Sequence, residues 1–375
     1  MPLEPGGTSC PNNFCSVKTL AKTLREKMKK ILFASSAIAA VAFAGQASAS
    51  EPIKLSLGGY MEQWVGFSDE DRPGSDGRNN AFQSDTEVYF DGETILDNGI
   101  QVGAHIELEG ETSTDQVDEQ FLYVSGGFGR IEMGKNDSAA DSMGVTAPTV
   151  GPVNPSDGGT EDWVNLTNVI DTVPSSGDQN RVTWFTPNMG GFQAGFSVAD
   201  DSNTNGSFDK VVTTNAQGQQ VVGGLSSDTS GNGDSVLSAA VAYDHDFDGF
   251  SLGLSLEGES QGNDEWYGAG VNVGFGNFTV GGSYGHVDPD ATSDTNAFDL
   301  GLTYAMDAAS VGVSYAYQDD NADDIQNQGL SVGMAYTLGA GVSWQSSVFW
   351  FDEDTNGANN DNDGYGAVTG LALNF

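Results

Sequence analysis

Cysteine and basic residues are both scarce in this chain of 375 residues. It has two cysteines, and 13 Lys and Arg stand against 53 Asp and Glu, which gives a formal net charge of −40. Such a surface excludes nucleic-acid binding, because phosphate contacts need clustered basic residues. The same charge attracts cations. We interpret most of the acidic side chains as solvated loop surface.

Long hydrophobic runs are also absent, except for one near the N-terminus. Lysines precede an apolar run over 31–45, and Ala47-Ser48-Ala49 follows it, which is the order of a secretory signal peptide. The run is shorter than the roughly 20 residues that a transmembrane helix needs. We therefore predict a misassigned start or extension over 1–27, a signal peptide over 28–49 and the processed domain over 50–375.

Processing at this site would remove both cysteines, Cys10 and Cys15, and with them disulfide or thiol chemistry. Of the acidic residues only Glu4 and Glu26 would be lost, so 51 would remain against seven basic residues, a net charge of −44.

Apolar and polar residues alternate through most of the remaining chain. Leu371, Leu373 and Phe375 share one face of a C-terminal strand, and small or polar residues occupy the other face. Trp344 and Trp350 share a face about 20 Å apart at ~3.3 Å per residue, which suits two aromatic girdles of a membrane barrel. The candidate strands are 53–67, 81–94, 100–109, 119–126, 130–135, 181–187, 191–200, 235–247, 250–259, 265–275, 277–287, 296–306, 309–319, 327–338, 341–352 and 365–375.

This pattern predicts an all-β fold, a 16-stranded antiparallel transmembrane β-barrel with an apolar face toward lipid and a polar lumen. Barrels of about this size enclose water rather than a packed core. Fourteen or eighteen strands would fit the same up-and-down plan. We expect few large apolar or aromatic residues on the inward faces, too few for a solid core or for a line of sugar-binding rings.

Several short patterns resemble catalytic or nucleotide-binding motifs, but each lacks a residue or a structural context that the motif requires. The stretch 129–136 nearly matches a phosphate-binding loop, but Asn136 replaces the required hydroxyl residue. His105, His245 and His286 lack metal-ligand spacing. G-x-S-x-G occurs at 249–253, 281–285 and 329–333, each time in or at the start of an alternating strand rather than before a helix. We therefore predict that the protein is not an enzyme.

One acidic loop fits the template of a calcium-binding loop. Asp352, Asp354, Asn356 and Asp363 occupy its first, third, fifth and twelfth positions. A second fragment, 201–209, matches less well. The alternative is an ordinary turn rich in Asn, Asp and Gly on a barrel rim. Calcium in such loops is the one cofactor that the sequence suggests.

The segment 136–179 has no strand periodicity and is too long for an ordinary connection. We predict that it folds into the lumen as a constriction, with Arg130, Glu132 and Arg181 directed inward from neighbouring strands. Charges facing each other across a narrow passage decide ion preference. A disordered external loop is the alternative. The loop's acidic candidates are Asp137, Asp141, Glu161 and Asp162.

Several stretches resemble the general-diffusion porins of Gram-negative bacteria, especially those of α-proteobacterial type. They are Phe90–Gly99, Gly127–Lys135, Asn180–Pro187 and the terminal Phe375, and the likeness spans essentially the whole processed chain. The resemblance implies a trimer of sixteen-stranded barrels in the outer membrane, in contact with lipid and lipopolysaccharide. It also implies that the segment after Lys135 is a third loop folded into the pore.

By the same resemblance, Arg130 and Arg181 belong to a basic wall, and Asp137 and Asp141 belong to the acidic loop. Phe375 matches a terminal aromatic that the barrel assembly machinery recognises. The chain departs from the pattern in its few basic residues, which favours cations.

The expected function is passive diffusion of ions and small hydrophilic solutes through a water-filled channel. Two alternatives remain: a channel of the same fold selective for a solute such as a sugar or phosphate, and a calcium-binding surface or adhesion protein of the outer membrane.

Overall fold

The computed structural model describes residues 52–72, 77–111, 116–199, 210–214, 220–225, 234–290, 294–321, 324–356 and 361–375. The predicted extension, signal peptide and weaker calcium-loop fragment at 201–209 lie outside these residues. Within the described part of the chain, no helix is long and apolar enough to cross a membrane.

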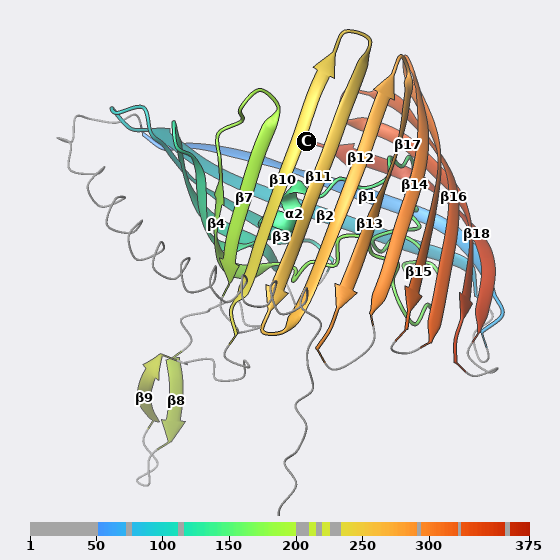
Figure 1. Cartoon of the computed structure of the whole chain (residues 1–375), viewed down its shortest axis with the longest axis horizontal. Helices are drawn as coiled ribbons and strands as arrows, with labels where there is room; N and C mark the ends of the chain where they lie inside the picture. Colours follow the sequence, from blue (N-terminus) through green and yellow to red (C-terminus); the bar gives the residue numbers. More distant parts are fainter. Residues whose placement is uncertain are drawn as a thin grey trace, which may run out of the picture. The chain divides into compact units, whose positions relative to one another are not determined.

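Sixteen antiparallel strands close into one barrel, in which β1 pairs with β18 (Figure 1). They are β1 (Lys54–Glu70), β2 (Arg78–Ile95), β3 (Gln101–Glu109), β4 (Val117–Gly126), β5 (Gly129–Asn136), β6 (Gln179–Phe185), β7 (Phe192–Ala199), β10 (Val236–Phe247), β11 (Phe250–Gln261), β12 (Asp264–Phe275), β13 (Phe278–Asp288), β14 (Thr295–Met306), β15 (Ala309–Asp320), β16 (Ile325–Gly339), β17 (Val342–Asp354) and β18 (Asn362–Asn374).

The predicted plan of sixteen strands is confirmed, and each predicted segment corresponds to one barrel strand. Several strands extend beyond their predicted ends, as β1 does through Asp69 and Glu70, because ladder hydrogen bonds continue where the apolar pattern stops. Two short strands were not predicted: β8 (Lys210–Thr214) and β9 (Gln220–Leu225) form a separate two-stranded sheet.

The two faces of the barrel wall differ as the alternation requires. Leu330 pairs with Trp350, and Val332 pairs with Val348, and all four side chains are exposed on the outer face. Between them Ser331 is buried on the inner face. Trp344 and Trp350 are both exposed on the outer face of β17, as the girdle pattern predicts.

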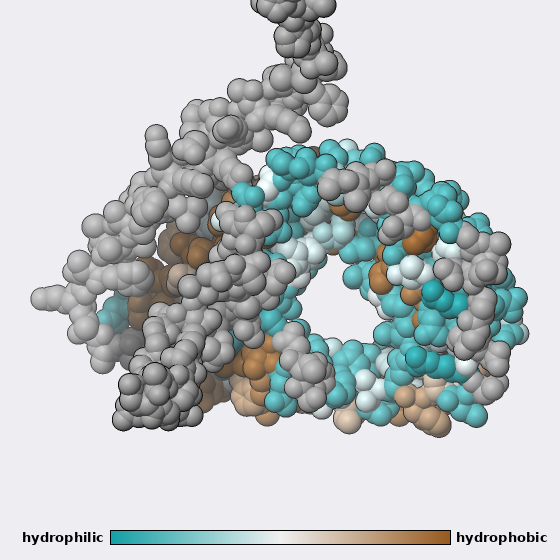
Figure 2. Space-filling model, turned by 90° about the horizontal axis from the view of Figure 1, so that it is seen from below, coloured by the Kyte–Doolittle hydropathy of each residue, from teal (hydrophilic) through white to brown (hydrophobic). Residues whose placement is uncertain are grey.

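An open passage is visible through the barrel when it is viewed from below (Figure 2). Hydrophilic residues form much of its edge. The segment between β5 and β6 includes one short helix, α2 (Ala139–Met143), which lies among the strands in Figure 1. This helix contacts β6, β7, β10 and β11.

Candidate pore constriction

The segment 137–178, which we call the inner loop, follows the barrel wall for most of its length. Going outward from β5, its backbone N–H groups donate to side chains of successive strands, from Ser238 on β10 to Ser347 on β17. On the way back Thr167 donates to Glu353 and Ser176 to Glu259. These acceptors belong to the polar faces of their strands, so the inner loop lies along the inside of the wall.

Glycines on the inner face make this close approach possible. A Cβ atom on Gly333 would collide with the carbonyl oxygen of Val150, and one on Gly270 would collide with that of Val145. Gly285 and Gly301 face loop carbonyl oxygens in the same way, and a Cβ atom on Gly66, Gly195 or Gly329 would collide with a side chain of the loop. The glycines of the G-x-S-x-G patterns in β13 and β16 are therefore part of a strand face, and Gly285, Gly329 and Gly333 serve as seats for the loop.

Buried carboxylates on the covered wall hold the loop by accepting its backbone N–H groups. Asp299 on β14 is 2% exposed and accepts from Ala147 at 3.2 Å. Glu353 on β17 is fully buried and accepts from the N–H of Thr167 at 2.6 Å and from its hydroxyl at 2.8 Å. Such charge-assisted bonds are stronger than neutral ones. Some of the acidic residues that we interpreted as solvated surface are thus internal anchors.

The loop also contributes to a small apolar cluster inside the barrel. Trp163 is 2% exposed and packs with Trp64, Phe349 and Phe351 from the inner faces of β1 and β17. We expected few large apolar residues on the inward faces. This expectation is wrong at β1 and β17, because the loop supplies apolar partners for the inward side chains of these strands.

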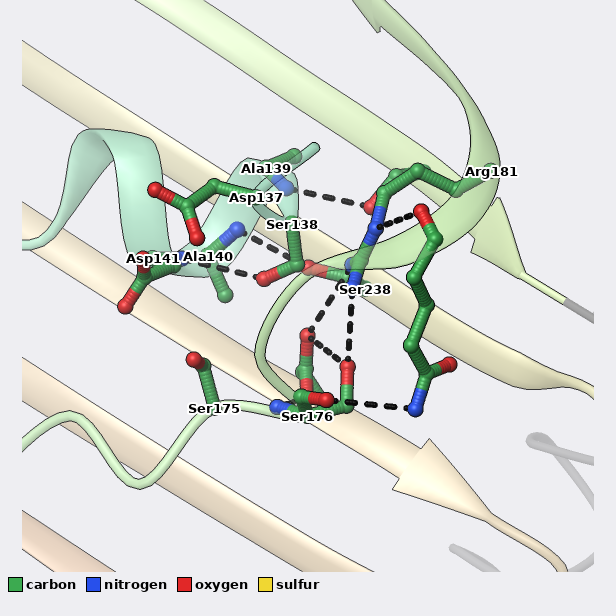
Figure 3. A network of polar contacts seen from close by, with 12 residues as sticks. Asp137, Ser138, Ala139, Ala140, Asp141, Ser175, Ser176, Arg181 and Ser238 are labelled. Carbon is green, nitrogen blue, oxygen red and sulfur yellow. Dashed lines mark hydrogen bonds and ion pairs between the residues drawn. The ribbon is translucent and has the colours of Figure 1, made fainter. Parts of the chain in front are cut away.

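Arg181 and the acidic start of the loop lie close together (Figure 3). Arg181 is 3% exposed, donates to the Ser176 hydroxyl at 3.2 Å and to the Gly177 carbonyl, and its Nη1 lies 3.8 Å from Glu259 Oε1. In this position Arg181 fastens the returning end of the loop. Its inward direction agrees with the sequence pattern, but the loop covers it.

Asp137 and Asp141 flank the start of α2. Ser138 caps that helix by accepting from the Asp141 N–H at 3.1 Å. Burial raises the pKa of the Asp137 carboxyl, and the neighbouring Asp141 raises it further.

Other loop carboxyls shift in the same direction. Burial raises the pKa of Asp171 to about 6, and burial together with Asp118 raises the pKa of Asp178 to about 6. The negative charge of the loop therefore increases as pH rises through neutrality.

The other predicted site residues lie on β5 and near the far turn of the inner loop. Arg130 forms an ion pair with Glu132, which is inward and buried. Glu161 and Asp162 lie near the far turn of the loop, where the Asp162 carbonyl accepts from Gln83 of β2. Arg130 is therefore paired within its own strand.

The wall of β1 to β4 carries a feature that sequence reasoning missed. Five inward rings, which we call the aromatic row, lie there: Tyr60, Tyr89, His105, Phe121 and Tyr123. Ring centroids are 6.3 Å apart from Tyr60 to Tyr89, 5.8 Å from Tyr89 to His105 and 5.3 Å from His105 to Phe121. The expectation that the lumen has no line of rings is wrong. The register of the four strands would have shown it, because all five residues lie on the face that also carries acidic side chains.

The calcium-loop residues lie at the β17–β18 end. Asp352 and Asp363 are paired across the two strands, and Gln328 donates to Asp352 at 3.0 Å. Within the described residues, the groups of three or more His, Asp or Glu side chains whose ligand atoms all lie within 4.8 Å of one another are elsewhere, for example His105, Glu107 and Glu119. Calcium binding stays a prediction.

Phe375 exchanges two backbone hydrogen bonds with Gly59, and its side chain is exposed. Its role in recognition by the assembly machinery also stays a prediction.

A closed, sixteen-stranded barrel with an apolar outside and an open polar passage is a channel of the outer-membrane type. The sequence supports this class independently, because the family model described as Gram-negative porin matches residues 34–369. The chain belongs to the Gram-negative porin family and is an outer-membrane channel rather than an enzyme.

Solved structures share the fold at low sequence identity. The anion-selective porin from Comamonas acidovorans is 16% identical and has a TM-score of 0.58, covering 86% of this chain and 100% of that one. The trimer form of OmpT, an outer membrane protein of Vibrio cholerae, is 12% identical with a TM-score of 0.59, covering 87% and 100%. The outer membrane channel DcaP of Acinetobacter baumannii is 13% identical with a TM-score of 0.56, covering 89% and 100%. Comparison with curated protein sequences gives no match.

Proposed function

We propose that this porin lets ions and small hydrophilic solutes cross the outer membrane by passive diffusion, that it prefers cations, and that it works as a homotrimer. The observation that carries the cation preference is the charge along the passage. Asp85, Glu87, Asp91, Glu93 and Glu107 all lie on the inner face of β2 and β3. Rings of carboxylates favour cations in a narrow pore.

The two arginines of the predicted basic wall do little to offset these carboxylates. Arg130 is paired with Glu132, and Arg181 is buried beside Glu259. The porin from Comamonas acidovorans is described as anion-selective. At 16% identity its lining charges need not match those of this chain, so the preference of each protein follows from its own side chains.

The barrel dimensions support the homotrimer. Strands β3 to β7 have 7 to 10 residues, whereas β10 to β18 have 11 to 15. The side of the barrel formed by β3 to β7 is therefore shorter, and we propose that it packs against neighbouring copies. OmpT of Vibrio cholerae has a trimer form.

Planar-bilayer recording tests the proposal. Purified protein should give stepwise, weakly voltage-dependent conductance, with a reversal potential in a KCl gradient of the sign for cation preference. Absence of conductance steps would refute the diffusion channel, and a reversal potential of opposite sign would refute the cation preference. Chemical cross-linking in detergent should give a trimer band, and a monomer alone would refute the oligomeric state.

A further inference from the structure

The aromatic row presents ring faces and carboxylates together on the part of the wall that the inner loop leaves uncovered. Tyr60, Tyr89 and Phe121 are each half-buried. The loop contacts this part of the wall only near its two ends. Gln83 donates to a loop carbonyl at one end, and Glu119 accepts from a loop N–H at the other. The rings between these margins border the passage.

Each polar ring of the row is bonded to carboxylates. The hydroxyl of Tyr60 donates to Asp85 at 3.0 Å, and that of Tyr89 donates to Glu87 at 2.7 Å. Donation to an anion increases the electron density of a phenol ring, which strengthens the negative potential over its face.

His105 lies in the middle of the row between two carboxylates. Its Nδ1 is 2.6 Å from Asp91, and its Nε2 is 2.6 Å from Glu107. Both nitrogens can donate to these carboxylates only when the imidazole is protonated, so His105 offsets one of the two charges, and the row keeps a net negative charge with Asp85 and Glu87 beside it.

A cation of the protein already occupies one end of the row. The Arg130 guanidinium carbon lies 3.9 Å from the ring centroid of Tyr123 and 6.0 Å from that of Phe121. Tyr123 has room to lie flat because Gly103 faces it, where a Cβ atom would collide with the ring. The contact with Arg130 shows that these ring faces can bind a cation.

We propose that the aromatic row is a binding site for small organic cations, such as those with a quaternary ammonium group, on their way through the pore. This inference rests on the proposed channel function and names a class of solute for it. Potassium keeps its water shell near carboxylates, whereas an alkylammonium is weakly hydrated and gains from contact with ring faces. A neutral sugar would gain nothing from the negative charge of the row, and an anion would be repelled.

Block of the potassium current by choline tests this site. Choline chloride should reduce the wild-type KCl conductance at millimolar concentration, and its uncharged isostere 3,3-dimethyl-1-butanol and sucrose should be at least about tenfold weaker. Tyr89→Leu and Phe121→Leu should each weaken choline block about 3- to 30-fold relative to the variant's own conductance. Tyr89→Phe should restore most of it, because it keeps the ring. Tyr336→Leu, on the exposed outer face of β16, is the matched control.

The outcomes separate the two proposals. Normal conductance without choline block, or equal block by the isostere or sucrose, would overturn the organic-cation site and leave the channel standing. Calorimetric titration of choline into the detergent-solubilised protein covers the case in which no conductance appears. Binding that is lost in Tyr89→Leu would then support the site while the channel function fails, and absence of binding would overturn both.

Discussion

The two halves of the lumen wall differ in side-chain size and in how their charges are used. Under the inner loop, from β10 through β17, the wall offers glycine, serine and buried carboxylates, and the backbone of the loop fills the space above them. Across the passage, the loop packs on Trp64 of β1 but leaves uncovered the aromatic row of β1 to β4 and the carboxylates beside it. Carboxylates under the loop accept its N–H groups, whereas those of the aromatic row accept from Tyr hydroxyls or pair with His105.

The contrast shows that acidic residues have different roles on the two halves of the wall. Asp299 and Glu353 are buried and bonded to the loop. Asp91 is 43% exposed. We therefore expect changes on the covered wall to alter the shape and stability of the constriction, and changes on the uncovered wall to alter which solutes pass.

Gly333→Val should have the largest effect. The added side chain would occupy the place of the Val150 carbonyl and push the loop toward the passage. Single-channel conductance should fall by more than roughly half, because the waist narrows. The matched control is Gly339→Val on the same strand, where a Cβ atom would meet nothing within 4 Å. Equal conductance of both variants would show that the loop is not seated on Gly333.

Glu353→Ala should loosen the loop at its far turn. The Thr167 N–H and hydroxyl lose a charged acceptor. Because Thr167 is exposed and water replaces part of these bonds, the loss of stability should be about 1–3 kcal/mol in all. The expected readout is faster protease cleavage within the loop and a lower thermal midpoint in detergent.

Glu109→Ala on the uncovered wall provides the comparison for that variant. Glu109 lies among Glu87, Glu111 and Asp118, so its removal relieves repulsion and should not lower the midpoint. A larger loss of stability in Glu109→Ala than in Glu353→Ala would contradict the assignment of the two walls.

The pH dependence should be the smallest effect. Because the pKa values of Asp171 and Asp178 are raised to about 6, both carboxyls ionise between pH 5 and pH 8 and cation preference should increase over that range. The folded state holds these protons more tightly than the unfolded state. The stability that these two groups contribute should therefore fall as pH rises from about 4 to about 6, and then level off. Reversal potentials at pH 5 and 8 check the first part, and a double Asn variant should show a smaller change.

The strand plan could be predicted because alternation of side chains follows directly from backbone geometry. Leu371 and Leu373 of β18, with Phe375 directly after it, identify the lipid face without any knowledge of the neighbouring strands. The same rule gave the inward direction of Arg130 and Arg181.

The details of the site depend on contacts between distant parts of the chain. Nothing local to Arg181 shows that residues 176–177 cover it, and nothing local to Gly333 shows that Val150 lies above it. The aromatic row was missed for another reason: in β1 the inward set includes Tyr60, Glu62 and Trp64, so large residues lie on both faces and size alone does not distinguish lumen from lipid. Only the paired register brings these rings together.

The most direct test of the central claim is the reversal potential in a KCl gradient, measured for the wild type and two matched double variants. Asp91→Asn with Glu107→Gln removes two carboxylate charges from the uncovered wall, and Asp299→Asn with Glu353→Gln removes two from the covered wall. We predict that the cation-to-anion permeability ratio falls at least about threefold in the first variant and stays within roughly twofold in the second. Equal ratios in all three proteins, or a larger fall in the second variant, would contradict the claim that the uncovered wall sets selectivity.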